Sequence, residues 1–206
     1  MRGLVFFLLA ALSATNAAAA DVSVSVRTSG GQPVRDAVVT LQSAGDHGGA
    51  IHFDWPYRMA QQNLQFDPFV LIVPVGAVVA FPNHDNVRHQ VYSFSPAHPF
   101  ELKLYGRDET RTVRFDKAGL VALGCNIHDS MVGFIKVVDT PYAAKTDASG
   151  AVVIHGVPDG AATLKVWHPY LKAPGNELSR DLQVSGQVRQ AIVADVRTPA
   201  RRSSAY

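Results

Sequence analysis

The stretch LVALGCNIHDSMVGFIKVV, residues 120–138, places a short polar loop between two apolar runs. The run LVAL leads into the loop and the run MVGFIKVV leads out of it, and both have the length and the β-branched content of β-strands. The loop contains Cys125, His128 and Met131, each three positions after the previous one. The stretch therefore predicts two strands with a thiol, an imidazole and a thioether held between them.

Short strand-like runs continue through most of the chain. They lie at residues 22–26, 37–43, 69–81, 89–95, 110–115, 151–157, 162–168 and 188–196. The run with Pro74 and Gly76 in its middle predicts a buried strand pair, and the runs on either side of the turn PDG predict another. Only residues 56–62 suggest a short helix. The fold class is therefore predicted to be all-β, of sandwich or barrel type.

The start of the chain has the features of a secretory signal peptide. Arg2 precedes an apolar run at residues 4–12, and Ala18 and Ala20 form an A-x-A cleavage site. The alternative is a membrane anchor, but the run is shorter than the roughly 20 apolar residues that span a bilayer core. We therefore expect a signal peptide at residues 1–20 and export to the periplasm or outside the cell, where cysteines usually pair.

Cys125 is the only cysteine of the 206-residue chain. In an oxidising compartment it has no intramolecular partner, and an exposed free thiol there would oxidise or cross-link. Two interpretations are open on this ground: a buried, inert cysteine that packs as a small apolar residue, or a thiolate bound to a metal ion. The histidine and the methionine that follow in the same loop favour the metal-bound thiolate.

The donor set in the loop suits copper. Sulfur ligands stabilise Cu(I), imidazole accepts either oxidation state, and a weak axial methionine tunes the potential. Zinc prefers more cysteine or carboxylate and rarely takes methionine. A copper site needs a second histidine, and the segment FPNHDNVRHQVYSFS offers His84 and His89. His89 begins an alternating strand, whereas His84 lies in the turn-like cluster NHDN, so we expect His89 to be the ligand.

Residues 63–138 resemble the cupredoxins, the small blue-copper β-sandwich proteins. The resemblance lies in FDPFVLIVPVGAVVAFPNHDNVRHQVYSF and in FDKAGLVALGCNIHDSM. These sequence patterns are most similar to those of periplasmic cupredoxin-like proteins labelled "methylamine utilization protein". The resemblance implies a Greek-key β-sandwich with one mononuclear type 1 copper ion. It also implies that His89, Cys125 and His128 are the strong ligands and Met131 the axial one.

The resemblance further implies how the site is surrounded. His128 would lie near the surface within an apolar patch, and electrons would leave through its ring edge. The candidates for that patch are Met131, Val132, Pro82 and Pro99. Asn83 is expected to link the histidine loop to the cysteine loop through side-chain hydrogen bonds. Many cupredoxins have asparagine directly after the strand histidine, and here that residue is Gln90.

The flanking segments are similar to two halves of a prealbumin-like, carboxypeptidase-regulatory-type β-sandwich. The resemblance lies in VSVRTSGGQPVRDAVVTL and in AAKTDASGAVVIHGVPDGAATLKVWHP. Neither half has enough strands for a core, so we expect a split domain of residues 21–45 plus 140–198. A cupredoxin domain of residues 53–139 is expected to be inserted in it, and residues 199–206 are expected to be a flexible tail. The alternatives are three separate pieces in a row or one enlarged cupredoxin.

The stretch GDHGGAIH at residues 45–52 is glycine-rich and predicts a linker. His47 and His52 within it are expected to be solvated, with a second copper site as the alternative. His168, which follows a tryptophan, is expected to pack in the core rather than to bind metal.

The expected function is that of a periplasmic type 1 copper protein that transfers electrons between redox partners, such as a cytochrome c or a dehydrogenase. It is not expected to be an enzyme, because the sequence has no nucleophile elbow, zinc-protease motif or phosphate-binding loop. A net charge of +2 without a basic stripe argues against nucleic acid, and the mature chain has no membrane-spanning run. The alternatives are copper delivery without redox cycling, for which three methionines are few, and an adhesion module.

Overall fold

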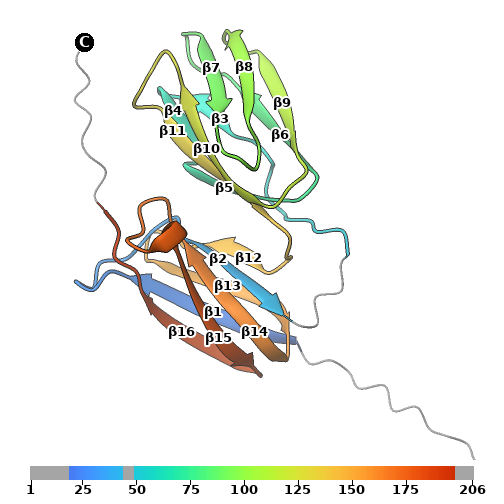
Figure 1. Ribbon diagram of the computed structural model, residues 1–206, viewed down its shortest axis with the longest axis vertical. Helices are drawn as coiled ribbons and strands as arrows, with labels where there is room; N and C mark the ends of the chain where they lie inside the picture. Colours follow the sequence, from blue (N-terminus) through green and yellow to red (C-terminus); the bar gives the residue numbers. More distant parts are fainter. Residues whose placement is uncertain (1–18, 44–48, 198–206) are drawn as a thin grey trace, which may run out of the picture.

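A computed structural model describes residues 19–43 and 49–197. These residues form sixteen β-strands in five sheets and one short 3₁₀ helix, η1 (Pro174–Asn176), which confirms the all-β prediction. Figure 1 shows the strands in two groups, one above the other. None of the helices within the described residues is long and apolar enough to cross a membrane.

The upper group in Figure 1 holds nine strands that are consecutive in the chain. They are β3 (Ala60–Gln62), β4 (Gln65–Asp67), β5 (Val70–Pro74), β6 (Ala77–Pro82), β7 (His89–Ser93), β8 (Phe100–Tyr105), β9 (Thr110–Phe115), β10 (Gly119–Cys125) and β11 (Val132–Val138). A five-stranded sheet has the order β5–β11–β10–β7–β8, and β6–β9 and β3–β4 form two small sheets. A parallel bridge links Gln61 of β3 to Asn83, the residue that follows β6. One apolar core, which includes Cys125 and Met131, fills this group.

The lower group contains the first two and the last five strands of the chain. They are β1 (Ala19–Arg27), β2 (Val38–Ser43), β12 (Ala143–Lys145), β13 (Ala151–Pro158), β14 (Gly160–Trp167), β15 (Glu177–Val184) and β16 (Gln187–Val193). Their two sheets have the orders β13–β1–β16 and β12–β2–β14–β15 and enclose a second apolar core. The chain therefore leaves this group after β2 and returns to it at β12, which pairs with β2.

The two groups are packed against each other through a third apolar cluster. Strand β5 is buried along its whole length because its residues contribute to both this cluster and the upper core. Across the contact, the rings of Phe134 and Trp167 meet edge to face with centroids 5.9 Å apart. Lys136 forms an ion pair with Glu177 at 3.0 Å. The upper group thus contacts the lower group through β5 and through β11, the strand that follows the cysteine loop.

Three expectations about local structure are wrong. Residues 56–62 form no helix: they contain β3, and Arg58 is bridged to Ala80. The predicted pair at residues 69–81 is divided, since β5 pairs with β11 and β6 with β9. Strands β13 and β14 also lie in different sheets, with β1 and β2 as their partners. An apolar run shows where a strand lies, but its partner is chosen by distant residues.

Several predicted segments lie outside the described residues. These are most of the signal peptide with Ala18, the part of the linker that contains His47, and the tail at 199–206. The last two residues of the predicted signal peptide are described and begin β1, where Ala20 pairs with Val157.

Candidate metal centre

The hairpin of β10 and β11 presents the donors of the sequence motif. Its strands pair in antiparallel register, so the loop between them closes one end of the hairpin. Cys125 is the last residue of β10, and His128 lies in the loop. The amide of Met131 donates to the carbonyl oxygen of His128 over 2.9 Å. This bond folds the loop into a turn and returns Met131 to the start of β11.

His89 comes from β7, the strand next to β10 in the five-stranded sheet. Val91 of β7 pairs with Cys125, which places His89 just beyond the end of β10. The pairing of β7 with β8 shifts register between His89 and Val91, and irregularities of this kind are common next to functional sites. His89 Nδ1 lies 3.7 Å from Cys125 Sγ.

Three side chains converge at this end of the upper group. One donor atom each of His89, Cys125 and His128 lies within 4.8 Å of the other two. The imidazole rings of the two histidines have centroids 5.0 Å apart and are inclined at 60°. His89 and Cys125 are buried and His128 is partly buried. The structure thus brings together the thiol and both imidazoles that the sequence motif singled out.

His128 Nδ1 has no hydrogen-bond partner among the described residues, although it is buried. A buried polar atom without a partner costs free energy, so native proteins rarely leave one. The cluster beside it offers one sulfur and a second ring nitrogen, and it contains no carboxylate. An ion that prefers sulfur and nitrogen donors would use the free lone pair of His128. The residues present therefore fit a bound soft metal ion.

The second nitrogen of His89 points away from the cluster and meets a carboxylate. His89 Nε2 lies 2.8 Å from Asp85 Oδ2, and the two carboxylate oxygens also accept the backbone amides of Asn63 and Leu64. Burial acts to raise the pKa of Asp85, but the bonds from His89, Leu64 and Asn63 outweigh it and hold the pKa below its ordinary value. The carboxylate is therefore charged at neutral pH, and the ring N–H donates to it.

Met131 is fully buried and belongs to the same apolar core as Cys125. Both residues line a hollow of about 430 Å³, together with Tyr92 and Phe94 of the neighbouring segment. Met131 would hold the metal ion only through its thioether sulfur, and that role stays a prediction.

His84 lies outside the cluster of donor atoms, and the side chains of Asn83 and Gln90 form hydrogen bonds elsewhere. His84 is exposed and is not part of the cluster. The expectation that Asn83 links the two loops is wrong, because its side chain bonds to Val87, Tyr105 and the Asp85 amide. Gln90 donates to Glu101 of β8 instead. The histidine loop is therefore tied to itself and to β8, and the cysteine loop is placed by strand pairing.

The apolar surface near the loop differs from the expected patch. Met131 cannot belong to it because its side chain is fully buried, whereas Val132 and Pro82 are half-buried and Pro99 is exposed. The exposed apolar side chains here are Ile127, which is 48% exposed, and Phe94, which is 85% exposed. Ile127 lies inside the motif itself, so its position next to His128 was available as a signal.

His52 and His168 behave as the sequence predicted. His52 is exposed, and His168 is buried, with its Nδ1 accepting the Tyr170 amide over 3.2 Å. Burial lowers the pKa of His168, so its ring is neutral at pH 7.

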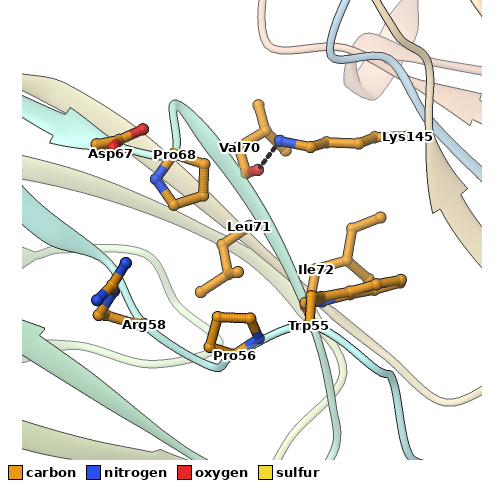
Figure 2. Close-up of a pocket in the computed structure, with 9 residues that line it drawn as sticks. All are labelled: Trp55, Pro56, Arg58, Asp67, Pro68, Val70, Leu71, Ile72 and Lys145. Atoms are coloured by element: carbon orange, nitrogen blue, oxygen red, sulfur yellow. Dashed lines mark hydrogen bonds between the residues drawn. The ribbon is translucent and has the colours of Figure 1, made fainter.

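A separate cavity of about 260 Å³ lies at the free edge of β5, and none of the predicted metal ligands lines it (Figure 2). Its lining residues are Trp55, Pro56, Arg58, Asp67, Pro68, Val70, Leu71, Ile72 and Lys145. Trp55 Nε1 donates to the carbonyl oxygen of Ile72, and Lys145 Nζ donates to that of Val70. These bonds occupy the outward carbonyls of an edge strand and protect it against pairing with another chain.

No family model and no curated protein matches this chain. Solved structures similar to it include the copper-containing nitrite reductase of Thermus scotoductus SA-01, at 28% identity and a TM-score of 0.39. That alignment covers 45% of this chain and 24% of the reductase, so the chain spans about a quarter of the reductase's length.

Two smaller solved proteins are aligned over nearly their whole length. A purple cupredoxin from Nitrosopumilus maritimus is 20% identical, with a TM-score of 0.36 over 39% of this chain and 98% of the cupredoxin. A variant of amicyanin in its reduced Cu(I) form is 19% identical, with a TM-score of 0.38 over 48% of this chain and 98% of amicyanin. The solved structures similar to this chain thus include a copper-containing reductase, a purple cupredoxin and a Cu(I) form of amicyanin. The residues of this chain itself present a candidate His89–Cys125–His128 metal site.

Proposed function

We propose that this chain is a periplasmic type 1 copper protein that transfers electrons between redox partners through one mononuclear site. The observation that supports this most directly is the convergence of one thiol and two imidazoles, with the buried Nδ1 atom of His128 left without a hydrogen-bond partner in the part of the chain that the structure describes. His89, Cys125 and His128 would be the strong ligands, and Met131 the axial one. Sulfur and imidazole in this combination are the ligands of electron-transfer copper.

Copper bound to these residues supplies a one-electron Cu(II)/Cu(I) couple. The chain's own contribution is to fix the positions of the donor atoms and to bury Cys125 and His89 away from water. Cys125 and His89 stand on neighbouring paired strands, and the turn bond between Met131 and His128 fixes the loop. Ligands mounted on rigid elements keep their positions when the charge of the bound ion changes.

The partner is proposed to be a periplasmic cytochrome c or dehydrogenase. His128 is the one ligand of the three that is only partly buried, and the exposed Ile127 lies beside it in the same loop. A small apolar surface of this kind suits the weak, short-lived encounters of redox proteins. We also propose that the signal peptide directs the chain to the periplasm.

We further propose that residues 53–139 form a cupredoxin domain inserted in a prealbumin-like domain of residues 21–45 plus 140–198. The flanking strands share two sheets and one apolar core. Strand β12 pairs directly with β2, so the insertion would leave and re-enter at neighbouring strands. Domain insertion is tolerated where the inserted ends lie close together.

Copper titration with spectroscopy tests the proposal. The purified protein is loaded with one equivalent of Cu(II), and its visible absorption and electron paramagnetic resonance spectrum are recorded. Intense thiolate-to-copper charge transfer that disappears on reduction and returns on oxidation is expected, and Cys125→Ser should abolish the colour. His84→Ala, which removes an exposed histidine of the same segment, is the matched control and should change nothing.

Two outcomes would overturn the proposal. Colourless, tight binding of Cu(I) without reversible oxidation would indicate copper delivery. Binding of zinc in preference to copper, with four-coordinate geometry, would indicate a structural site.

A further inference from the structure

Asp85 connects a metal-site histidine to a hairpin that lies earlier in the chain. Strands β3 and β4 are joined by the two residues Asn63 and Leu64, both with positive φ of 56°. Positive φ at both central residues is the geometry of a type I′ turn. The amides of this turn donate to the two oxygens of Asp85 at 2.7 Å and 3.1 Å. The turn therefore holds the carboxylate of Asp85 in place independently of its contact with His89.

This anchoring decides which nitrogen of His89 carries the proton. A carboxylate only accepts hydrogen bonds, so the 2.8 Å contact of Asp85 Oδ2 with His89 Nε2 requires a proton on Nε2. In the neutral ring, Nδ1 then has a free lone pair. That lone pair is the one that lies 3.7 Å from Cys125 Sγ. The ring is thus held in the form that can bind a metal ion at Nδ1.

The β3–β4 turn holds Leu64 in a backbone conformation that is unfavourable for leucine. Leucine rarely adopts the left-handed conformation, which brings its Cβ close to the following carbonyl oxygen. Strained backbone of this kind persists only where the surroundings hold it. Asp85 supplies such a hold through its carboxylate, and its own backbone amide donates to Asn83 Oδ1 over 2.9 Å. Both the backbone and the side chain of Asp85 are therefore fixed.

We propose that Asp85, clamped by the β3–β4 turn, is a positioning residue that sets the tautomer and orientation of His89 for metal binding at Nδ1. The inference rests on the proposed function in one respect only: Nδ1 is taken to be a ligand atom. Partners of this kind in metal sites typically change metal affinity by about 10–100-fold when they are removed.

The tautomer is measured first, in the metal-free protein. Histidine ring nitrogens of ¹⁵N-labelled protein are observed by nuclear magnetic resonance at a pH of about 8, above the ordinary histidine pKa of about 6.5. In the wild type, His89 is expected to show one tautomer, with a slowly exchanging proton on Nε2. In the isosteric variant Asp85→Asn, one of the two accepting oxygens becomes an N–H₂ donor, which faces either a turn N–H or the ring N–H of His89. A mixed population of His89 tautomers and faster exchange of the ring proton with water are therefore expected.

Copper affinity is measured second, by competition with a chelator. Asp85→Asn is expected to lose about 10–100-fold in affinity, as outer partners of metal ligands do. The matched control is Asp108→Asn, the same change at an exposed carboxylate in a nearby turn that also has positive φ. Leu64→Gly keeps the turn amide and removes the strained side chain, so it should preserve the single tautomer. Thermal unfolding of the metal-free variants tests whether each is folded.

The outcomes separate this inference from the proposed function. A single Nε2–H tautomer and unchanged copper affinity in Asp85→Asn would overturn the positioning role while leaving the copper site intact. A wild-type protein that shows the single tautomer but binds no copper would overturn the proposed function and leave the role of Asp85 in orienting the ring standing.

Discussion

Gly133→Ala is predicted to destabilise the protein, because a glycine on β11 permits the β3–β4 hairpin to pack onto the sheet. A Cβ atom at Gly133 would lie 2.7 Å from the Cβ atom of Phe66 and 3.1 Å from its Cγ atom. Carbon atoms in favourable contact are about 3.5–4.0 Å apart, so the two elements must separate by roughly 1 Å. Phe66 is buried, and its Cβ atom cannot move without the backbone of β4.

The expected loss of stability follows from this geometry. Overpacking of a close-packed core typically costs about 1–3 kcal/mol. In a protein of this size, each kcal/mol lowers the melting temperature by roughly 2–4 °C. Urea unfolding and calorimetry of the metal-free protein measure the change. Gly106→Ala is the matched control, because an added Cβ there meets only a glutamate oxygen at 3.4 Å.

A second comparison makes the reasoning refutable. Gly124→Ala meets an equally close neighbour at 2.7 Å, but that neighbour is the far end of the Tyr92 ring. Tyr92→Leu is therefore expected to relieve most of the cost of Gly124→Ala, whereas Phe66→Ala keeps its Cβ atom and should not relieve Gly133→Ala. A Gly133→Ala protein as stable as the Gly106→Ala control would show that the hairpin is not held against β11 as described.

Two further predictions concern the lower group. Trp167 is buried and its Nε1 atom has no hydrogen-bond partner among the described residues, so Trp167→Phe removes an unsatisfied donor and is expected to stay within about 1 kcal/mol of wild type. Trp167→Ala is expected to cost about 3–5 kcal/mol in urea unfolding, and equal costs would contradict this account. Burial lowers the pKa of His168, so the unfolded chain binds its proton more readily and stability is lost as pH falls below about 6.5. His168→Gln should flatten that part of the stability–pH curve, and an unchanged curve would refute it.

Much of the candidate site could be predicted from the sequence because it is local. Cys125 and His128 lie three residues apart between two apolar runs, and a hairpin loop of that length brings its own residues together whatever surrounds it. The preference for His89 over His84 rested on a strand beginning at His89, and β7 does begin there. His89 is buried and His84 is exposed.

The partners of each strand were not predictable in the same way. The run at 69–81 was correctly recognised as two strands, yet β5 pairs with β11 and β6 with β9. Alternation and β-branching describe one strand's faces, whereas pairing depends on which distant edge is free. The β3–β4 hairpin left no usable signal, since an Asn-Leu turn lacks the glycine that marks most two-residue turns.

By itself, the sequence determined the class of the fold, the positions of most strands, and the presence of a thiol, an imidazole and a thioether in one loop. Only the tertiary structure decided that His89 Nδ1 faces Cys125 Sγ and that Asp85 holds the far side of the His89 ring. It also decided that the Nδ1 atom of His128 is buried with no hydrogen-bond partner at residues 19–43 and 49–197. The physical reason is that spacing along a chain sets which residues a turn brings together. The direction of a ring nitrogen is set by strand register and by hydrogen bonds from residues far away in the sequence.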